Sequence, residues 1–165
     1  MTETSPVITI CDRFDSNKIK CVSVGRAMPH TEIKIVNPET FEILPWGETG
    51  EICARGAAVM RGYWDDDKKT KENIVNGWMR TGDLGAFDDD GYVMILGRAK
   101  DMIIRGGENI YPKEIEEYLM KHPNVADAYV IGVNDDKMGE EVCVWLKVKE
   151  PEQTSAKDVH DYCKG

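Results

Sequence analysis

Basic residues, long apolar runs and closely spaced cysteines are all scarce in this sequence. The 21 Lys and Arg residues are outnumbered by 30 Asp and Glu residues, which gives a formal net charge of −9. An acidic surface repels nucleic acid and anionic membranes, because few protein cations are available to replace their counterions. No apolar run approaches the roughly 20 residues that a transmembrane helix needs. We therefore expect neither a nucleic acid partner nor a transmembrane segment.

The cysteines follow no disulfide or zinc-binding pattern. Their number is odd, they are widely scattered and none belongs to a C-x-x-C pair; they are Cys11, Cys21, Cys53, Cys143 and Cys163. Disulfide scaffolds and structural zinc sites both need paired spacings. Residues 1–6 also lack the features of a signal or transit peptide. We expect an intracellular protein with reduced cysteines, and the sequence does not decide between mitochondrial matrix and cytoplasm.

The first hundred residues are typical of short strands joined by turns. Alternating or β-branched runs predict strands at 33–36, 51–54 and 92–96. The segment Asp88-Asp89-Asp90-Gly91 is a hairpin signal rather than a calcium loop, because its acidic residues do not alternate and no distal Glu completes a ligand set.

The pattern changes after Gly97. An apolar strand is predicted at 102–104, and Pro112 opens a helix that we expect to run to about His122. Further strands are predicted at 129–133 and 142–148, and Ser155 with Asp158 resembles a capping box that starts another helix. We expect the two units to meet at 98–101. Because the last helix has only just begun at Gly165, we also expect the C-terminal unit to be cut short.

Asp83 is the first candidate site residue, within Trp78-Met79-Arg80-Thr81-Gly82-Asp83-Leu84-Gly85. A carboxylate that follows a glycine turn can accept hydrogen bonds from two vicinal hydroxyls, as in ribose binding, and each bond contributes roughly 1.5 to 3 kcal/mol. The same side chain could instead cap its own backbone in an Asx-turn. The local residues leave both interpretations open.

A second candidate segment, residues 97–112, combines charge with glycine. Arg98 carries a rigid donor fork that can bind a ribose or phosphate oxygen. Lys100 and Asp101 lie where the strand pattern changes, as hinge residues would. The pair Gly106-Gly107 lets the backbone approach a ligand closely, or simply forms a turn. Taken singly, each residue also has a plain structural explanation.

Taken together in their order along the chain, the N-terminal pair Thr2-Glu3 and the two candidate segments resemble the adenylate-forming enzymes. This superfamily contains acyl-CoA synthetases, luciferases and peptide-synthetase adenylation domains. The matches are Thr2-Glu3 to the Thr-Glu motif, residues 80–83 to the Thr-Gly-Asp motif and residues 97–116 to the hinge motif, with further similarity at 47–52, 60–64 and 135–140. The hinge segment is most similar to that of the medium-chain fatty-acid CoA ligases.

The resemblance implies an ATP-dependent acid–thiol ligase that activates a fatty acid as acyl-AMP and transfers it to CoA. It also implies nine site residues with distinct roles. These are Thr2 and Glu3 at the ATP phosphate, with Glu3 also serving Mg²⁺; Asp83 and Arg98 at the ribose; Lys100 as the hinge; and Arg105, Gly106, Gly107 and Glu108 along the CoA tunnel.

The resemblance further implies an α+β fold in two parts. Residues 1–97 are expected to be a distorted antiparallel β subdomain that ends the large N-terminal domain, and residues 98–101 the hinge. Residues 102–165 are expected to form the truncated small domain, a mixed sheet with helices on one face. The family's Gly-rich phosphate loop and C-terminal lysine are absent from the sequence.

We therefore interpret the chain as a ligase fragment that is inactive by itself. Two alternatives stay open. One is a non-catalytic module that binds a nucleotide or a partner. The other is an adenylating enzyme with another acceptor, either luciferase-like or peptide-carrier.

Overall fold

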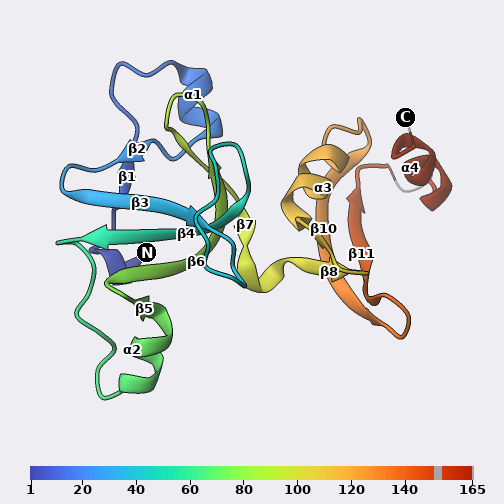
Figure 1. Ribbon diagram of the computed structural model, residues 1–165. Coiled ribbons are helices and arrows are strands. Elements are labelled where there is room, and N and C mark those ends of the chain that lie inside the picture. The colour runs from blue at the N-terminus through green and yellow to red at the C-terminus, as the bar shows by residue number, and fades with distance from the viewer. Residues whose placement is uncertain (151–153, 165) are drawn as a thin grey trace. The chain divides into compact units, whose positions relative to one another are not determined.

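The computed structural model describes residues 1–150 and 154–164, and it divides into two compact units, Met1–Ala99 and Lys100–Gly165 (Figure 1). Each unit has its own sheet and its own hydrophobic core. The division falls within the segment 98–101, where the pattern of the sequence changes. Among the described residues, no helix combines the length and apolar character that crossing a membrane requires.

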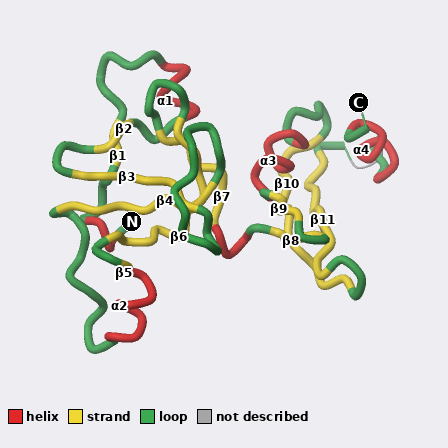
Figure 2. The backbone as a smooth tube through the Cα atoms, viewed as in Figure 1, coloured by secondary structure: helices red, strands yellow, loops and turns green. Residues whose placement is uncertain are grey.

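The first unit is built on a five-stranded antiparallel sheet (Figure 2). In it β3 pairs with β4 and β4 with β6, while β5 pairs with the start of β6 and β7 with its end. A separate pair of short strands, β1 and β2, lies beside this sheet. The bounds are β1 Thr9–Ile10, β2 Arg26–Ala27, β3 Thr31–Val36, β4 Gly50–Gly56, β5 Ile74–Val75, β6 Trp78–Phe87 and β7 Val93–Arg98. The strands predicted at 33–36, 51–54 and 92–96 are confirmed as β3, β4 and β7.

The core of the first unit comes from residues of the three strands β3, β4 and β7. Ile35, Ile52 and Val93 are each at most 3% exposed and form one cluster, against which Ile33, Leu44 and Phe87 pack. Such side chains face the core because successive residues of a strand point to opposite faces. The sheet is distorted, as expected, with register shifts between Glu51 and Cys53 on β4 and between Leu84 and Gly85 on β6.

Cys53 is expected to be protected from thiol reagents in the folded protein. The residue is 2% exposed, and burial, with a further contribution from the charge of Glu51, raises the pKa of its thiol to about 11. Because the thiolate is the reactive form, iodoacetamide at neutral pH should modify the exposed Cys21 and Cys163 well before Cys53. Mass spectrometry of labelled peptides checks this order, with urea as the control that exposes all three. Modification of Cys53 at the rate of Cys21 would contradict the buried position.

Two short helices of the first unit were not predicted. They are α1 Asn17–Val22 and α2 Asp67–Asn73, and neither buries a residue. Each begins at a side-chain cap, since Ser16 accepts a hydrogen bond from the Ile19 amide and Asp66 accepts one from the Lys69 amide. Helices this short and exposed carry no apolar periodicity, which is why sequence patterning misses them.

The second unit has a four-stranded sheet in the order β10-β11-β8-β9. Its bounds are β8 Ile103–Arg105, β9 Glu108–Ile110, α3 Pro112–Leu119, β10 Val125–Asp135, β11 Gly139–Val148 and α4 Ala156–Tyr162. Every strand pair is antiparallel across the described part of this unit. The expectation of a mixed sheet was therefore wrong. Short hairpin turns join β8 to β9 and β10 to β11, and such turns can only produce antiparallel neighbours.

Both helices of the second unit contribute to one core. Leu119 of α3 and Val159 of α4 form a cluster with Val125 and Ala128 of β10, and Leu146 of β11 packs against it. Ser155 forms the predicted capping box with Asp158 at the start of α4. Helix α3 ends at Leu119 rather than at about His122, where the sequence predicted its end. The Lys121 and His122 amides donate hydrogen bonds only three residues back, and this tightens the last turn before the next proline.

Candidate functional site

The first candidate site lies where the pairing between β4 and β6 is interrupted. Glu51 pairs with Leu84 and Cys53 with Arg80, so Ile52 alone lies opposite residues 81–83. We name residues 81–83 the Asp83 turn. Gly82 has a φ of +71°, a left-handed conformation that glycine adopts without strain. The bulge therefore takes Asp83 out of the ladder with β4.

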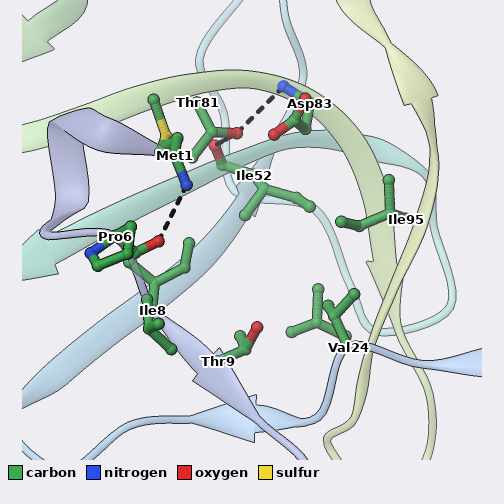
Figure 3. Close-up of a pocket in the computed structure, with 11 residues that line it drawn as sticks. Met1, Pro6, Ile8, Thr9, Val24, Ile52, Thr81, Asp83 and Ile95 are labelled. Carbon is green, nitrogen blue, oxygen red and sulfur yellow. Dashed lines mark hydrogen bonds between the residues drawn. The ribbon is translucent and has the colours of Figure 1, made fainter. Parts of the chain in front are cut away.

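Asp83 and Arg98 are brought together across β6 and β7. They are register partners in this antiparallel pair, and Arg98 Nε lies 3.3 Å from Asp83 Oδ1. The hydroxyl of Thr81 accepts a hydrogen bond from the Asp83 amide at 3.1 Å, while it donates to the carbonyl of Ile52 at 2.8 Å (Figure 3). The backbone of the turn is thus capped by Thr81, and the carboxylate of Asp83 is paired with Arg98.

Burial and the neighbouring Arg98 charge shift the pKa of the Asp83 carboxyl in opposite directions. Burial raises the pKa of its carboxyl above the ordinary 3.8, the Arg98 guanidinium lowers it, and the nearby charge of Glu51 raises it further. The net direction is upward. An acceptor with a raised pKa is protonated at a higher pH than an exposed aspartate, so its capacity to accept two hydroxyl hydrogen bonds is lost earlier on acidification.

A cavity of about 300 Å³ adjoins Asp83 (Figure 3). Apart from Asp83, Thr81 and Thr9, the side chains that line it are apolar. The lining residues are Met1, Pro6, Val7, Ile8, Thr9, Val24, Ile52, Thr81, Asp83, Val93 and Ile95. An apolar cleft with a small number of polar groups is the common form of a small-molecule site.

Thr2 and Glu3 lie in a short 3₁₀ helix, Thr2–Thr4, and do not line this cavity. Tyr63 donates a hydrogen bond from its hydroxyl to Glu3 Oε1 at 3.2 Å, and the Met60 amide donates to the Glu3 carbonyl at 2.8 Å. The structure therefore joins Glu3 to residues 60–63, a second segment of the sequence resemblance. It does not bring Glu3 into contact with Asp83.

A single carboxylate fits Mg²⁺ only in part. Glu3 is a hard oxygen donor of the kind that Mg²⁺ prefers, but in residues 1–150 and 154–164 no group of three or more His, Cys, Asp or Glu side chains is arranged to hold a metal ion. A magnesium ion at Glu3 would thus need most of its ligands from a nucleotide and from water.

Lys100 lies in the 3₁₀ helix Ala99–Asp101, at the division between the two units. Its side chain is 72% exposed and lies 3.9 Å from the Asp101 carboxylate. A solvent-exposed pair at this distance contributes little to stability. The segment is thus held only weakly by its side chains, as a hinge requires.

The last four candidate residues form the hairpin turn between β8 and β9. Arg105 and Glu108 are register partners, and the two glycines between them have φ values of +60° and +87°. Arg105 Nε donates to Glu141 Oε1 at 2.8 Å, and the Gly106 amide donates to the Met138 carbonyl at 2.8 Å. Arg105 and Gly106 are therefore tied to β11 and the loop before it.

Gly106 and Gly107 differ in what surrounds them. A Cβ atom at Gly106 would lie 2.5 Å from Met138 Cε, whereas a Cβ atom at Gly107 would meet nothing within 4 Å. The atom met at the first position is the end of a flexible methionine side chain, so the positive φ is the stronger reason for glycine there. At the second position the positive φ favours glycine, and the space beside it is open.

Sequence reasoning missed one buried charge at the site. Glu51 is 2% exposed, pairs with Arg80 and accepts a hydrogen bond from the Gly82 amide. A signal was available, because an acidic residue directly before the apolar run Ile52-Cys53-Ala54 has no place in a core strand unless it is paired.

The chain belongs to the AMP-binding enzyme family. The sequence model of that family matches residues 1–64, and the sequence model of its C-terminal domain matches residues 114–165. Among curated proteins, the mitochondrial medium-chain acyl-CoA ligases ACSF2 of rat and cattle are each 49% identical over 99% of this chain. The chain spans 27% of the length of these relatives.

Solved structures of related enzymes have the same fold. An ATP-bound chimera of RpMatB and BxBclM is 39% identical and superposes on all of this chain with a TM-score of 0.91, over 32% of its own length. The o-succinylbenzoate CoA synthetase of Bacillus subtilis, with its acyl-adenylate intermediate, is 38% identical with a TM-score of 0.84, over 99% of this chain and 33% of its own.

Proposed function

We propose that this chain supplies the ribose-binding turn and the small C-terminal domain of an AMP-forming acid–thiol ligase for medium-chain fatty acids. In this proposal residues 1–97 end the large domain, 98–101 form the hinge and 102–165 form the small domain. The observation that carries the proposal is the pairing of Asp83 and Arg98 on a bulge beside an apolar cavity, in a chain 49% identical to acyl-CoA ligases.

The proposed reaction has two steps. A carboxylate oxygen of the fatty acid attacks the α-phosphorus of ATP, and the bond to the bridging oxygen breaks, so that pyrophosphate leaves with the electron pair. The CoA thiol, after losing its proton, then attacks the carbonyl carbon of the acyl-adenylate. The bond from that carbon to the phosphate oxygen breaks and AMP leaves, which completes the thioester.

The candidate residues serve the first step by position and charge. The ionised Asp83 would accept hydrogen bonds from both ribose hydroxyls, and Arg98 would hold its carboxylate in place beside the sugar. Thr2 and Glu3 would lie at the phosphate, where Glu3 would hold Mg²⁺ together with the nucleotide oxygens. When bound, Mg²⁺ would neutralise charge on the phosphates.

The second step is assigned to the small domain. Rotation about Lys100 would exchange the contacts that the small domain makes during adenylate formation for those it makes during thioester formation. Such a rotation is feasible because a few exposed residues between two compact units can absorb a large backbone change. Residues 105–108 would then border the path of the CoA pantetheine arm. The open space beside Gly107 supports this assignment.

A chimera tests the proposed function. The chain replaces the matching quarter of the rat relative, and the product is assayed with octanoate, palmitate, ATP and CoA. We expect octanoyl-CoA, AMP and pyrophosphate in equal amounts, with octanoate used faster than palmitate. Pyrophosphate release without thioester would favour an adenylating enzyme with another acceptor. A folded chimera that forms no adenylate would support a non-catalytic module.

Binding of ribose at Asp83 should also depend on pH. Because burial raises the pKa of this carboxyl, adenosine affinity should fall, on acidification, at a higher pH than the ordinary value of 3.8 would produce. The effect of Asp83 on folding stability has the opposite sign. Because its pKa is raised in the folded state, Asp83 stabilises the folded protein at low pH, and this stabilisation is lost as the pH rises. Calorimetric titration with adenosine, which has no phosphate to titrate, tests this. Affinity for 2′,3′-dideoxyadenosine is the control and should lack this step.

A further inference from the structure

The backbone of the Asp83 turn is held by side chains, because it has left the ladder with β4. Where Ile52 alone opposes residues 81–83, the Gly82 amide donates to Glu51 Oε1 at 3.1 Å and the Asp83 amide donates to the Thr81 hydroxyl at 3.1 Å. A buried amide without a partner costs free energy, so such replacements are expected wherever a bulge breaks a ladder. Glu51 is the only one of these two acceptors that comes from another strand.

The carboxylate of Glu51 has both of its oxygens engaged. Arg80 donates to Oε2 from Nε at 2.9 Å and from Nη2 at 2.6 Å, while Oε1 accepts the Gly82 amide. The Arg80 guanidinium also lies 4.3 Å from the centre of the Phe41 ring. Glu51 is therefore fixed on both sides, and it fixes the residue directly before Asp83.

A second Glu–Arg pair on the same sheet provides a contrast. Glu32 and Arg55 pair across β3 and β4, but their side chains are 60% and 45% exposed, and Glu32 holds no backbone amide of a bulge. Exposed pairs contribute little to stability, and burying a pair costs desolvation that its attraction often fails to offset. The Glu51–Arg80 pair thus differs from the exposed pair in two respects: the Glu51 carboxylate is buried, and it holds the amide of the residue directly before Asp83.

We propose that Glu51 is a positioning residue for nucleotide recognition, which, together with Arg80, fixes the Gly82 amide and so aims the Asp83 carboxylate at the ribose hydroxyls. Glu51 acts through Asp83 and does not touch the nucleotide. This inference rests on the proposed function, in which Asp83 binds ribose. It predicts that removing the charge of Glu51 harms recognition of the two hydroxyls and spares the rest of the nucleotide.

The experiment compares two nucleotides on three proteins. The wild-type chain, Glu51→Gln and the matched control Glu32→Gln are titrated with AMP and with 2′,3′-dideoxy-AMP by calorimetry. The wild type should bind AMP more tightly. Glu51→Gln should weaken AMP binding about tenfold, since it weakens a charge-assisted hydrogen bond, and leave dideoxy-AMP binding unchanged. Glu32→Gln should change neither affinity.

The results separate this inference from the proposed function. If the wild type binds both nucleotides equally, Asp83 does not recognise ribose and both proposals fall. If the wild type discriminates and Glu51→Gln either discriminates equally well or loses both nucleotides to the same extent, only the positioning role falls. The difference between the AMP and 2′,3′-dideoxy-AMP affinities is the readout that a general loss of packing would not give, and an NMR titration of Asp83 adds a second readout. In Glu51→Gln the pKa of the Asp83 carboxyl should drop, because the charge of Glu51 contributes to raising it.

A measurement on the wild type keeps the inference testable if Glu51→Gln does not fold. The Gly82 amide, bonded to a buried carboxylate, should exchange with deuterium as slowly as the amides of Leu84 and Ala86 in the sheet. Exchange at the rate of an exposed loop would show that the bond does not hold the turn, and would overturn the proposal.

Discussion

Replacing Asp83 with asparagine is expected to lower kcat/KM for ATP about thirtyfold in the chimera with the rat relative. Hydrogen bonds to a charged acceptor contribute ~1.5–3 kcal/mol and those to a neutral one ~0.5–1.5, so two such bonds lose about 2 kcal/mol together. Pyrophosphate release at varied ATP concentration measures the effect.

The matched control for Asp83→Asn is Asp89→Asn, which makes the same change at an exposed turn residue. It should leave kcat/KM for ATP unchanged. A further check uses 2′,3′-dideoxy-ATP, on which Asp83→Asn and wild type should perform alike. Equal losses with ATP and with the dideoxy nucleotide would show that Asp83 does not act through the ribose hydroxyls.

Replacing Gly107 with leucine is expected to abolish thioester formation while leaving adenylate formation intact. In the proposed second step this residue borders the pantetheine path, and a bulky side chain there would keep the thiol from the acyl carbon, at a cost of about 100-fold or more. Within its own unit the first side-chain atom has room, since a Cβ atom at Gly107 has nothing within 4 Å. Pyrophosphate release and acyl-CoA formation, measured separately, distinguish the two half-reactions.

The control for Gly107→Leu is Gly107→Ala, because both impose a side chain on a residue with a φ of +87°. Backbone strain should affect the two variants alike, whereas obstruction should affect leucine far more. Comparable losses in both half-reactions, or the same loss in alanine and leucine, would contradict the assignment to the CoA path.

Strong local patterns predicted much of the fold. The alternation within β3 and β11, the apolar runs within β4 and β10, the proline that opens α3 and the capping box of α4 are properties of neighbouring residues, so they can be identified in the sequence. The short helix α1, by contrast, depends on one Ser16 cap and buries nothing. The antiparallel direction of the second sheet was missed because periodicity gives strands but not their pairing.

The sequence singled out candidate site residues, but its local patterns did not contain their arrangement. The motif around Asp83 and the segment containing Arg98 were visible in the sequence, and the family resemblance assigned both residues to the ribose. The register of β6 and β7 adds that their side chains pair directly. The burial of Glu51 had a local signal, but its partners did not, because Arg80 and Gly82 are 29 and 31 residues away along the chain. Contacts of that separation depend on the sheet register, which local patterns do not contain.

The most direct test of the central claim is an NMR titration of the ¹⁵N-labelled chain with adenosine. If Asp83 binds ribose, the amide signals of Gly82, Asp83 and Arg98 should move most, and 2′,3′-dideoxyadenosine should leave them nearly unmoved. Equal shifts with both nucleosides, or shifts confined to residues away from the Asp83 turn, would contradict the assignment of this turn to nucleotide binding.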